Sequence, residues 1–160
     1  MSSYPITPAG VEKLKKELAK LKNVERGKVS KEIGVAREMG DISENFEYHA
    51  AKDRQGMIEA KIRDLEDKLS RAQIIDPAKL SGERVVFGAK VVLVDVETEE
   101  EKTYQIVGEV EASAEKGLIS VQSPVARALI GREVGDEVKV PGRAGPRLME
   151  IAEVTFCEVP

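Results

Sequence analysis

A run of mostly apolar positions in the second quarter of the chain constrains the fold more than any other feature. The positions alternate at spacings of three and four without a break, and they are Tyr48, Ala51, Gln55, Ile58, Ile62, Leu65, Leu69 and Ala72. Lys, Arg, Asp and Glu fill the other faces of the helix that this spacing predicts. A heptad pattern over more than three repeats is typical of a helix that packs along a second helix. Residues 48–72 therefore need a helical partner elsewhere in the chain.

The partner helix is predicted upstream, between Pro8 and Met39. Thr7 followed by Pro8 is a helix-start signal, because the hydroxyl can cap the helix and proline suits its first position. The apolar positions that follow are Val11, Leu14, Leu18, Leu21, Val29, Ile33 and Ala36, and their register slips between Leu21 and Val29. This slip predicts a local irregularity in the helix. At about 1.5 Å per residue, the segment would form one arm, roughly 50 Å long, of an antiparallel hairpin.

Composition changes near Asp76-Pro77, and the second half of the chain has a different character. No proline lies between Pro8 and Pro77, whereas β-branched residues, glycine and proline are frequent after it. Strand-like segments are predicted at 85–87, 90–96, 103–110, 118–122, 134–140 and 148–156, and a short helix at 125–130 begins after Ser123-Pro124. We therefore expect an α+β protein. A two-helix coiled-coil hairpin would span 1–76, and a small antiparallel sheet with one short helix would span 77–160.

Charge and composition exclude several classes of function. Residues 1–76 hold 15 Lys and Arg against 14 Asp and Glu, and residues 77–160 hold 10 against 15. A duplex-DNA binder is usually far more basic. One cysteine and one histidine nearly exclude a zinc site, so any metal site would use oxygen ligands. The single cysteine also fits a reducing cytoplasm, and neither a signal peptide nor an apolar run that could span a membrane is found.

The turn between the two helices carries the most informative residues. Gly40 can end the first helix, and Asp41 and Glu44 stand three residues apart in the turn. One interpretation is a capping box, in which Asp41 is the N-cap and Glu44 reaches back. The other is a pair of hard oxygen ligands suited to Mg²⁺, which could help hold the second ion of a two-metal phosphodiester cleavage. The two interpretations are compatible, because a capped turn is rigid and would preorganise the carboxylates.

Four segments in the same order carry a resemblance to a known family. They are the Thr7-Pro8 helix start with Gly10, the turn from Gly40 to Asn45, the stretch Glu47 to Ala51, and the stretch Ser123 to Gly131. Together they resemble the Gre transcript cleavage factors, most closely the GreA type, over nearly the whole chain. The resemblance implies an FKBP-like C-terminal domain and a hairpin that enters the secondary channel of bacterial RNA polymerase. There, Asp41 and Glu44 would stabilise a second Mg²⁺ shared with the polymerase, supported by Ser43 and Asn45.

The resemblance also implies contacts away from the acids. Arg37 and Lys52, with Arg54 as a weaker member, resemble the family's basic patch for the 3′ segment of backtracked RNA, although ordinary solvated helix charge is an equal alternative. Three residues match the segment that docks at the channel entrance, namely Gln122, Ser123 and Pro124. For Ser123 we favour a plain helix cap. The factor would be a cytoplasmic monomer that binds no cofactor stably and cleaves no RNA by itself.

One departure and two alternative functions remain open. Phe46 stands where the family usually has alanine, and its bulk could alter the fit of the turn in a narrow channel. A channel-binding inhibitor or scaffold without cleavage activity is one alternative, although the Asp41/Glu44 pair argues against it. A peptidyl-prolyl isomerase is the other. Fold analogy is its only support, and the three aromatic residues of the second half are too few for an aromatic-lined proline pocket.

Overall fold

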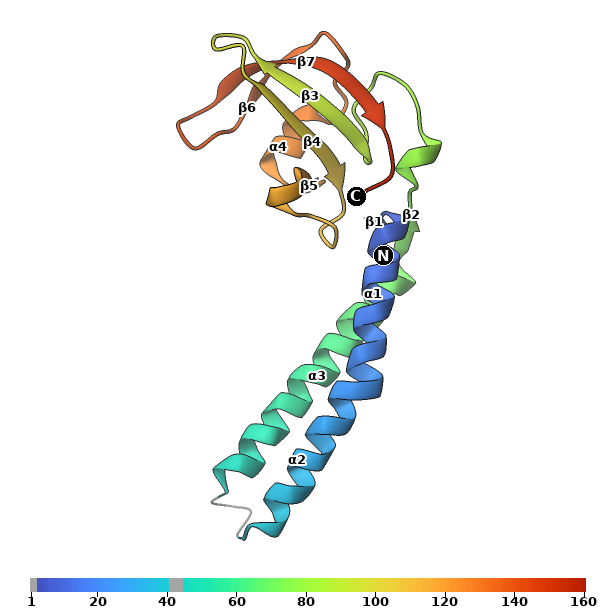
Figure 1. The fold of residues 1–160 in the computed structure, drawn as a ribbon, viewed down its shortest axis with the longest axis vertical. Helices are drawn as coiled ribbons and strands as arrows, with labels where there is room; N and C mark the ends of the chain where they lie inside the picture. The colour runs from blue at the N-terminus through green and yellow to red at the C-terminus, as the bar shows by residue number, and fades with distance from the viewer. Residues whose placement is uncertain (1–2, 41–44) are drawn as a thin grey trace. The chain divides into compact units, whose positions relative to one another are not determined.

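The computed structural model describes residues 3–40 and 45–160, which form two compact units (Figure 1). One unit is the helical segment Glu12–Arg71, and the other joins Met1–Val11 to Ala72–Pro160. Residues 3–11 therefore pack with the C-terminal half. Both the hairpin and the small α+β body expected from the sequence are present.

The hairpin is built from a first helix with one π-helical turn and an uninterrupted second helix. The first consists of α1 (Pro8–Lys20), a π-helical turn (Leu21–Glu25) and α2 (Arg26–Glu38), and the second is α3 (Phe46–Ser70). The π-helical turn lies where the apolar register slips. A π turn holds one more residue than an α turn and so absorbs such a slip. The predicted irregularity is confirmed, and the buried seam includes Leu14, Leu21, Val29, Ile33, Ala36, Ala51, Ile62 and Leu65.

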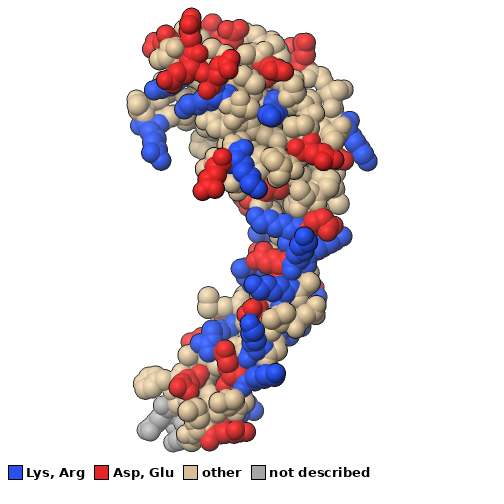
Figure 2. All heavy atoms as spheres, in the orientation of Figure 1, with Lys and Arg blue, Asp and Glu red and all other residues tan. Residues whose placement is uncertain are grey.

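Ion pairs join the two helices along the outside of this seam. Arg26 donates two hydrogen bonds to the Glu59 carboxylate, at 2.8 and 2.9 Å, and lowers the pKa of Glu59. Figure 2 shows positive and negative side chains interspersed along the hairpin. Exposed pairs of this kind stabilise a fold only weakly, because water and salt screen their charges. The apolar seam therefore supplies most of the stability of the pairing.

The base of the hairpin, which comprises β1 (Tyr4–Ile6), the start of α1 and β2 (Ala72–Ile74), is held by long-range contacts that the sequence pattern does not reveal. Strand β1 pairs in parallel with β2, in a register that places Ile6 opposite Ile74. Thr7 is fully buried, and its hydroxyl accepts a hydrogen bond from the Gly10 amide at 3.2 Å, which confirms the predicted cap. The Thr7 amide in turn donates to Glu111 Oε1 at 2.7 Å. A buried carboxylate from the C-terminal half thus fixes the start of α1.

The C-terminal half is a five-stranded sheet in the order β5-β4-β3-β7-β6 with one short helix. Its elements are β3 (Ala89–Asp95), β4 (Glu101–Val107), β5 (Leu118–Ser120), α4 (Pro124–Leu129), β6 (Glu137–Val140) and β7 (Arg147–Phe156), with 3₁₀ turns at Pro77–Lys79 and Ala114–Lys116. The core gathers residues of α4 with those of one sheet face, such as Leu129, Leu93 and Ile151.

Two details of the sheet differ from the prediction. The β4–β5 pair is parallel, so the sheet is mixed rather than antiparallel throughout. The chain between these strands makes a loop and a 3₁₀ turn before β5 joins the edge, which a tight hairpin could not do. The predicted strand at 85–87 is wrong. Val85 is buried and exchanges hydrogen bonds with the loop after α4, but it belongs to no strand.

Candidate functional site

Asn45 ties together the two helix ends that flank the acidic turn. Its Oδ1 accepts a hydrogen bond from the Tyr48 amide at 3.0 Å, which makes it the N-cap of α3. Its Nδ2 donates to the carbonyl oxygen of Ala36, near the end of α2. The capping-box interpretation is therefore wrong about the cap, which is Asn45 rather than Asp41. Asn45 anchors both sides of the connection between the helices.

Asp41, Ser43 and Glu44 lie outside the described residues. Within residues 3–40 and 45–160, no group of three or more His, Cys, Asp or Glu side chains could hold a metal ion. Two turn carboxylates fit the hard oxygen chemistry of Mg²⁺, which commonly takes only one or two protein carboxylates and completes its shell with water or phosphate oxygens. The donor set of this chain suits a shared ion, with other ligands supplied by a partner.

Arg37 and Lys52 lie on one face of the hairpin, on either side of Tyr48. The Arg37 guanidinium stands over the Tyr48 ring, 5.8 Å from its centroid, in a cation–π contact. Lys52 is one helical turn beyond Tyr48, and its Nζ is 3.2 Å from Gln55 Oε1. Both cations are exposed. Tyr48 thus relates the two predicted RNA contacts: Arg37 covers its ring from α2, and Lys52 follows it by one turn on α3.

Arg54 lies on a different face. It is two positions beyond Lys52, and residues two apart on a helix do not face each other. Its guanidinium nitrogens are 2.6 and 3.1 Å from Glu32 Oε2, in an ion pair between α3 and α2. This pair borders a cleft of about 380 Å³ that is lined by Lys31, Glu32, Val35, Ala36, Glu47, Ala50 and Arg54. The three predicted RNA contacts therefore do not form one patch.

The predicted docking residues surround the start of α4. Ser123 is its N-cap, and the Ser123 hydroxyl accepts a hydrogen bond from the Ala126 amide at 3.2 Å. Gln122 and Pro124 are exposed on either side of it. Ser123 thus has the structural role that we favoured, while its two neighbours are available to a partner.

Comparison with family models accounts for nearly all of the chain. The model described as "Transcription elongation factor, N-terminal" matches residues 4–74, and the model described as "Transcription elongation factor, GreA/GreB, C-term" matches residues 80–156. The chain belongs to the GreA/GreB family of transcription elongation factors. The family resemblance seen in the sequence is confirmed.

Individual relatives agree with this GreA/GreB assignment. The chain is 54% identical to the transcription elongation factor GreA of Jannaschia sp. over 98% of this chain and 99% of the relative. It is equally identical to GreA of Phenylobacterium zucineum, with the same coverage. A crystal structure of the GreA factor homolog 1 protein of Thermus thermophilus shares 31% identity with a TM-score of 0.43, covering 95% of this chain and 98% of that one.

Two further observations describe this GreA/GreB member. Within the described part of the chain, no helix is both long and apolar enough to cross a bilayer.

Glu111 is a residue that the sequence analysis missed, because a glutamate in a loop shows no pattern. Two glycines are signals of its position, because a side chain at Gly10 or at Gly108 would collide with the Glu111 carboxylate.

Proposed function

We propose that this GreA/GreB factor acts on bacterial RNA polymerase that has backtracked, and stimulates cleavage of the extruded RNA. The hairpin enters the secondary channel and presents Asp41 and Glu44 at the polymerase's catalytic centre. The observation that carries the proposal is the match to GreA relatives over almost the full length of the chain. The hydrogen bonds of Asn45, which join the helix ends on either side of these two acids, support it. Nothing in this function requires the chain to cleave RNA alone.

Each part of the factor has a defined role in the proposal. The two carboxylates of the turn would hold a second Mg²⁺, which would supply charge stabilisation and an activated water for phosphodiester cleavage. Asn45 joins the end of α2 to the start of α3, so the two helix ends that flank the turn keep a fixed spacing. Arg37 and Lys52 provide positive charge on one hairpin face, which suits RNA phosphates. Gln122 and Pro124 meet the rim of the channel.

The test is a cleavage assay on a stalled, backtracked elongation complex. We expect wild-type protein to shorten the RNA, and Asp41→Asn and Glu44→Gln each to abolish this stimulation while binding to the polymerase persists. Raising the Mg²⁺ concentration should restore part of the activity, because each variant keeps one carboxylate. Asp53→Asn is the matched control, since Asp53 is an exposed acid on α3, outside the turn.

Two results would count against the proposal. Cleavage by Asp41→Asn at the wild-type rate would remove the metal role of the turn. Wild-type protein that binds the complex without shortening the RNA would instead make the factor an inhibitor of the channel.

A further inference from the structure

A groove follows one face of the hairpin, between its two helices. It consists of the cleft beside Arg54 and a second cleft of about 370 Å³, which Leu21 and Met57 line from opposite helices. The residues that α3 contributes on its rim follow spacings of three and four through both clefts, and they are Glu47, Ala50, Arg54, Met57 and Lys61. Such spacing keeps residues on one face of a helix and is typical of a seam against another helix. The groove is therefore a second seam, beside the one that joins α3 to α2.

Two large apolar side chains lie exposed in this groove, one in each cleft. Met57 of α3 is 72% exposed, and Val35 of α2 is 59% exposed. Charged residues of both helices surround them. An exposed apolar stripe with a charged rim is typical of an interaction surface.

Each cleft keeps one acid and one cation after its internal ion pair is formed. Glu17 pairs with Lys61 at 3.0 Å in the second cleft, and Glu32 pairs with Arg54 at 2.6 Å in the first. The lining residues that form no ion pair with another described residue are Lys20 and Glu25 in the second cleft and Lys31 and Glu47 in the first. A partner of a single charge would meet a like charge in each cleft. The groove therefore favours a partner that carries both signs.

Two ion pairs show which residues of the two helices lie level with each other. Arg26 of α2 pairs with Glu59 of α3, and Glu32 of α2 pairs with Arg54 of α3. Met57 lies between Arg54 and Glu59 on α3. It is therefore level with a point near the middle of the stretch 26–32 on α2.

A two-fold axis at this level would make the groove complementary to itself. Glu25 and Lys31 lie on opposite sides of Met57 at similar distances along the hairpin, so each would meet the other residue of a second, antiparallel copy. Lys20 and Glu47 lie farther out on opposite sides and would meet in the same way. In a two-fold dimer every such contact occurs twice. The two Met57 side chains would pack at the axis itself.

We propose that this groove binds the same groove of a second copy of the chain, in antiparallel orientation, and forms a four-helix dimer of the free factor. Burial of Met57 and Val35 supplies attraction, and the ion pairs between the copies set the orientation. In the proposed function a paired hairpin is too thick for a narrow channel, so the monomer expected from the sequence is the form that acts. The dimer rests on the groove alone, whereas this consequence rests on the proposed function.

Sedimentation velocity of the full chain at increasing concentration tests the dimer. We expect the mass to rise from one chain to two. Met57→Glu places two like charges at the axis and should raise the dissociation constant at least about tenfold. Val96→Glu is the matched control, because Val96 is an exposed apolar residue of the C-terminal half, and it should stay within about twofold of wild type. A wild-type chain that stays monomeric, or two variants that behave alike, would overturn the proposal.

An exchange of charges tests the antiparallel orientation. Glu25→Lys alone and Lys31→Glu alone should each weaken self-association, because each sets like charges opposite one another. An equal mixture of these two variants should dimerise more strongly than either does alone, since every acid then meets a cation across the axis. The matched controls are Glu97→Lys and Lys139→Glu, at exposed positions of the C-terminal half, and each should dimerise like wild type. A mixture no stronger than its components would refute the two-fold pairing.

The polymerase is the alternative occupant of the groove. A wild-type chain that stays monomeric while Met57→Glu weakens its binding to core RNA polymerase would assign the groove to the polymerase and overturn the dimer. Wild-type factor that dimerises but stimulates no cleavage would refute the proposed function and leave the dimer standing.

Discussion

Replacing Gly10 with alanine should destabilise the base of the hairpin, although the same change stabilises most helices. A Cβ atom at Gly10 would lie 2.1 Å from Glu111 Oε1 and 2.5 Å from Glu111 Cδ. Real Cβ atoms do not approach other atoms so closely, so the carboxylate must move. Glu111 Oε1 accepts hydrogen bonds from both the amide and the hydroxyl of Thr7, and the added methyl group would break both.

The size of the effect follows from two opposing terms. Alanine is favoured over glycine by about 1 kcal/mol in a helix interior. Each hydrogen bond to a charged group contributes about 1.5–3 kcal/mol, and the two bonds from Thr7 to the Glu111 carboxylate would be lost. The difference predicts that Gly10→Ala lowers the free energy of opening the hairpin base by roughly 2–5 kcal/mol. Gly27 and Gly34 in α2 are the matched controls, because a Cβ at either position would meet no atom within 4 Å.

Native-state hydrogen exchange, resolved by peptide, measures this locally. In Gly10→Ala, peptides that cover β1, the start of α1 and β2 should exchange faster, whereas Gly27→Ala and Gly34→Ala should slow exchange in α2. Adding Glu111→Ala to Gly10→Ala should cost less than the two single changes together, since only the close approach to Ile6 Cγ1, at 2.6 Å, then remains. Slower exchange in Gly10→Ala, or strict additivity with Glu111→Ala, would refute this account of the Thr7–Glu111 contact.

Three further predictions follow from the described contacts. Asn45→Ala should destabilise the start of α3 by about 1 kcal/mol. Asn45→Asp should recover the cap of α3 but not the hydrogen bond to α2. Amide hydrogen exchange near the start of α3 measures both effects. Arg37→Ala with Lys52→Ala should slow cleavage of backtracked RNA at limiting factor, whereas Arg54→Ala should stay near wild type in the same kinetic assay. Two backbone amides and an arginine lower the pKa of Asp95. Its carboxylate therefore stabilises the fold at neutral pH, and the thermal midpoint difference between wild type and Asp95→Asn should shrink as the pH falls to about 3.

The hairpin could be predicted because its information is local. The spacing of Tyr48, Ala51, Ile62 and Leu65 fixes one face of α3 without reference to the rest of the chain. Even the π-helical turn at Leu21–Glu25 was visible as a slip in the apolar register. The cap of α3 was not, because Asp41 and Asn45 are both good capping residues. Only the backbone decides which of them precedes the first helical residue.

The sheet was harder to predict because burial and strand pairing are different properties. Val85 is as buried as any strand residue, yet it bonds only to the loop after α4, and an apolar run cannot distinguish these cases. The parallel β4–β5 pair has the same origin, since a segment of three residues carries no sign of its direction. Local patterns indicate which side chains become buried, whereas long-range pairing determines which residues they contact.

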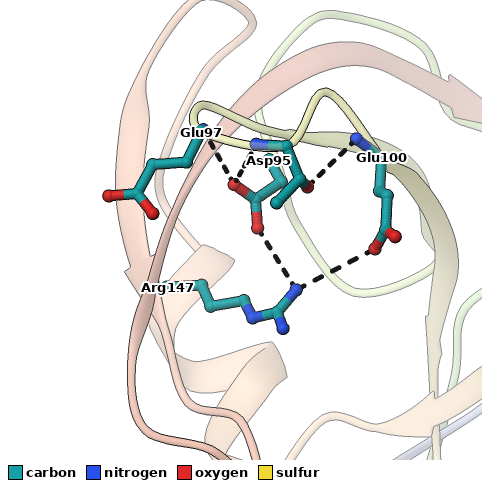
Figure 3. Close-up of polar contacts among 5 residues, drawn as sticks. Asp95, Glu97, Glu100 and Arg147 are labelled. Carbon is teal, nitrogen blue, oxygen red and sulfur yellow. Dashed lines mark hydrogen bonds and ion pairs between the residues drawn. The ribbon is translucent and has the colours of Figure 1, made fainter.

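Two of the described contacts join residues that lie far apart in the sequence. Thr7 meets Glu111, and Arg147 meets Asp95, across separations of 104 and 52 residues. In each pair a carboxylate holds another group in place: the first fixes the start of α1, and the second holds the Arg147 guanidinium at the start of β7 (Figure 3). Neither pairing follows from a local pattern, because each depends on how the whole chain folds. The proposed function calls for such rigidity, because residues presented to another enzyme's centre contribute only if they arrive already oriented.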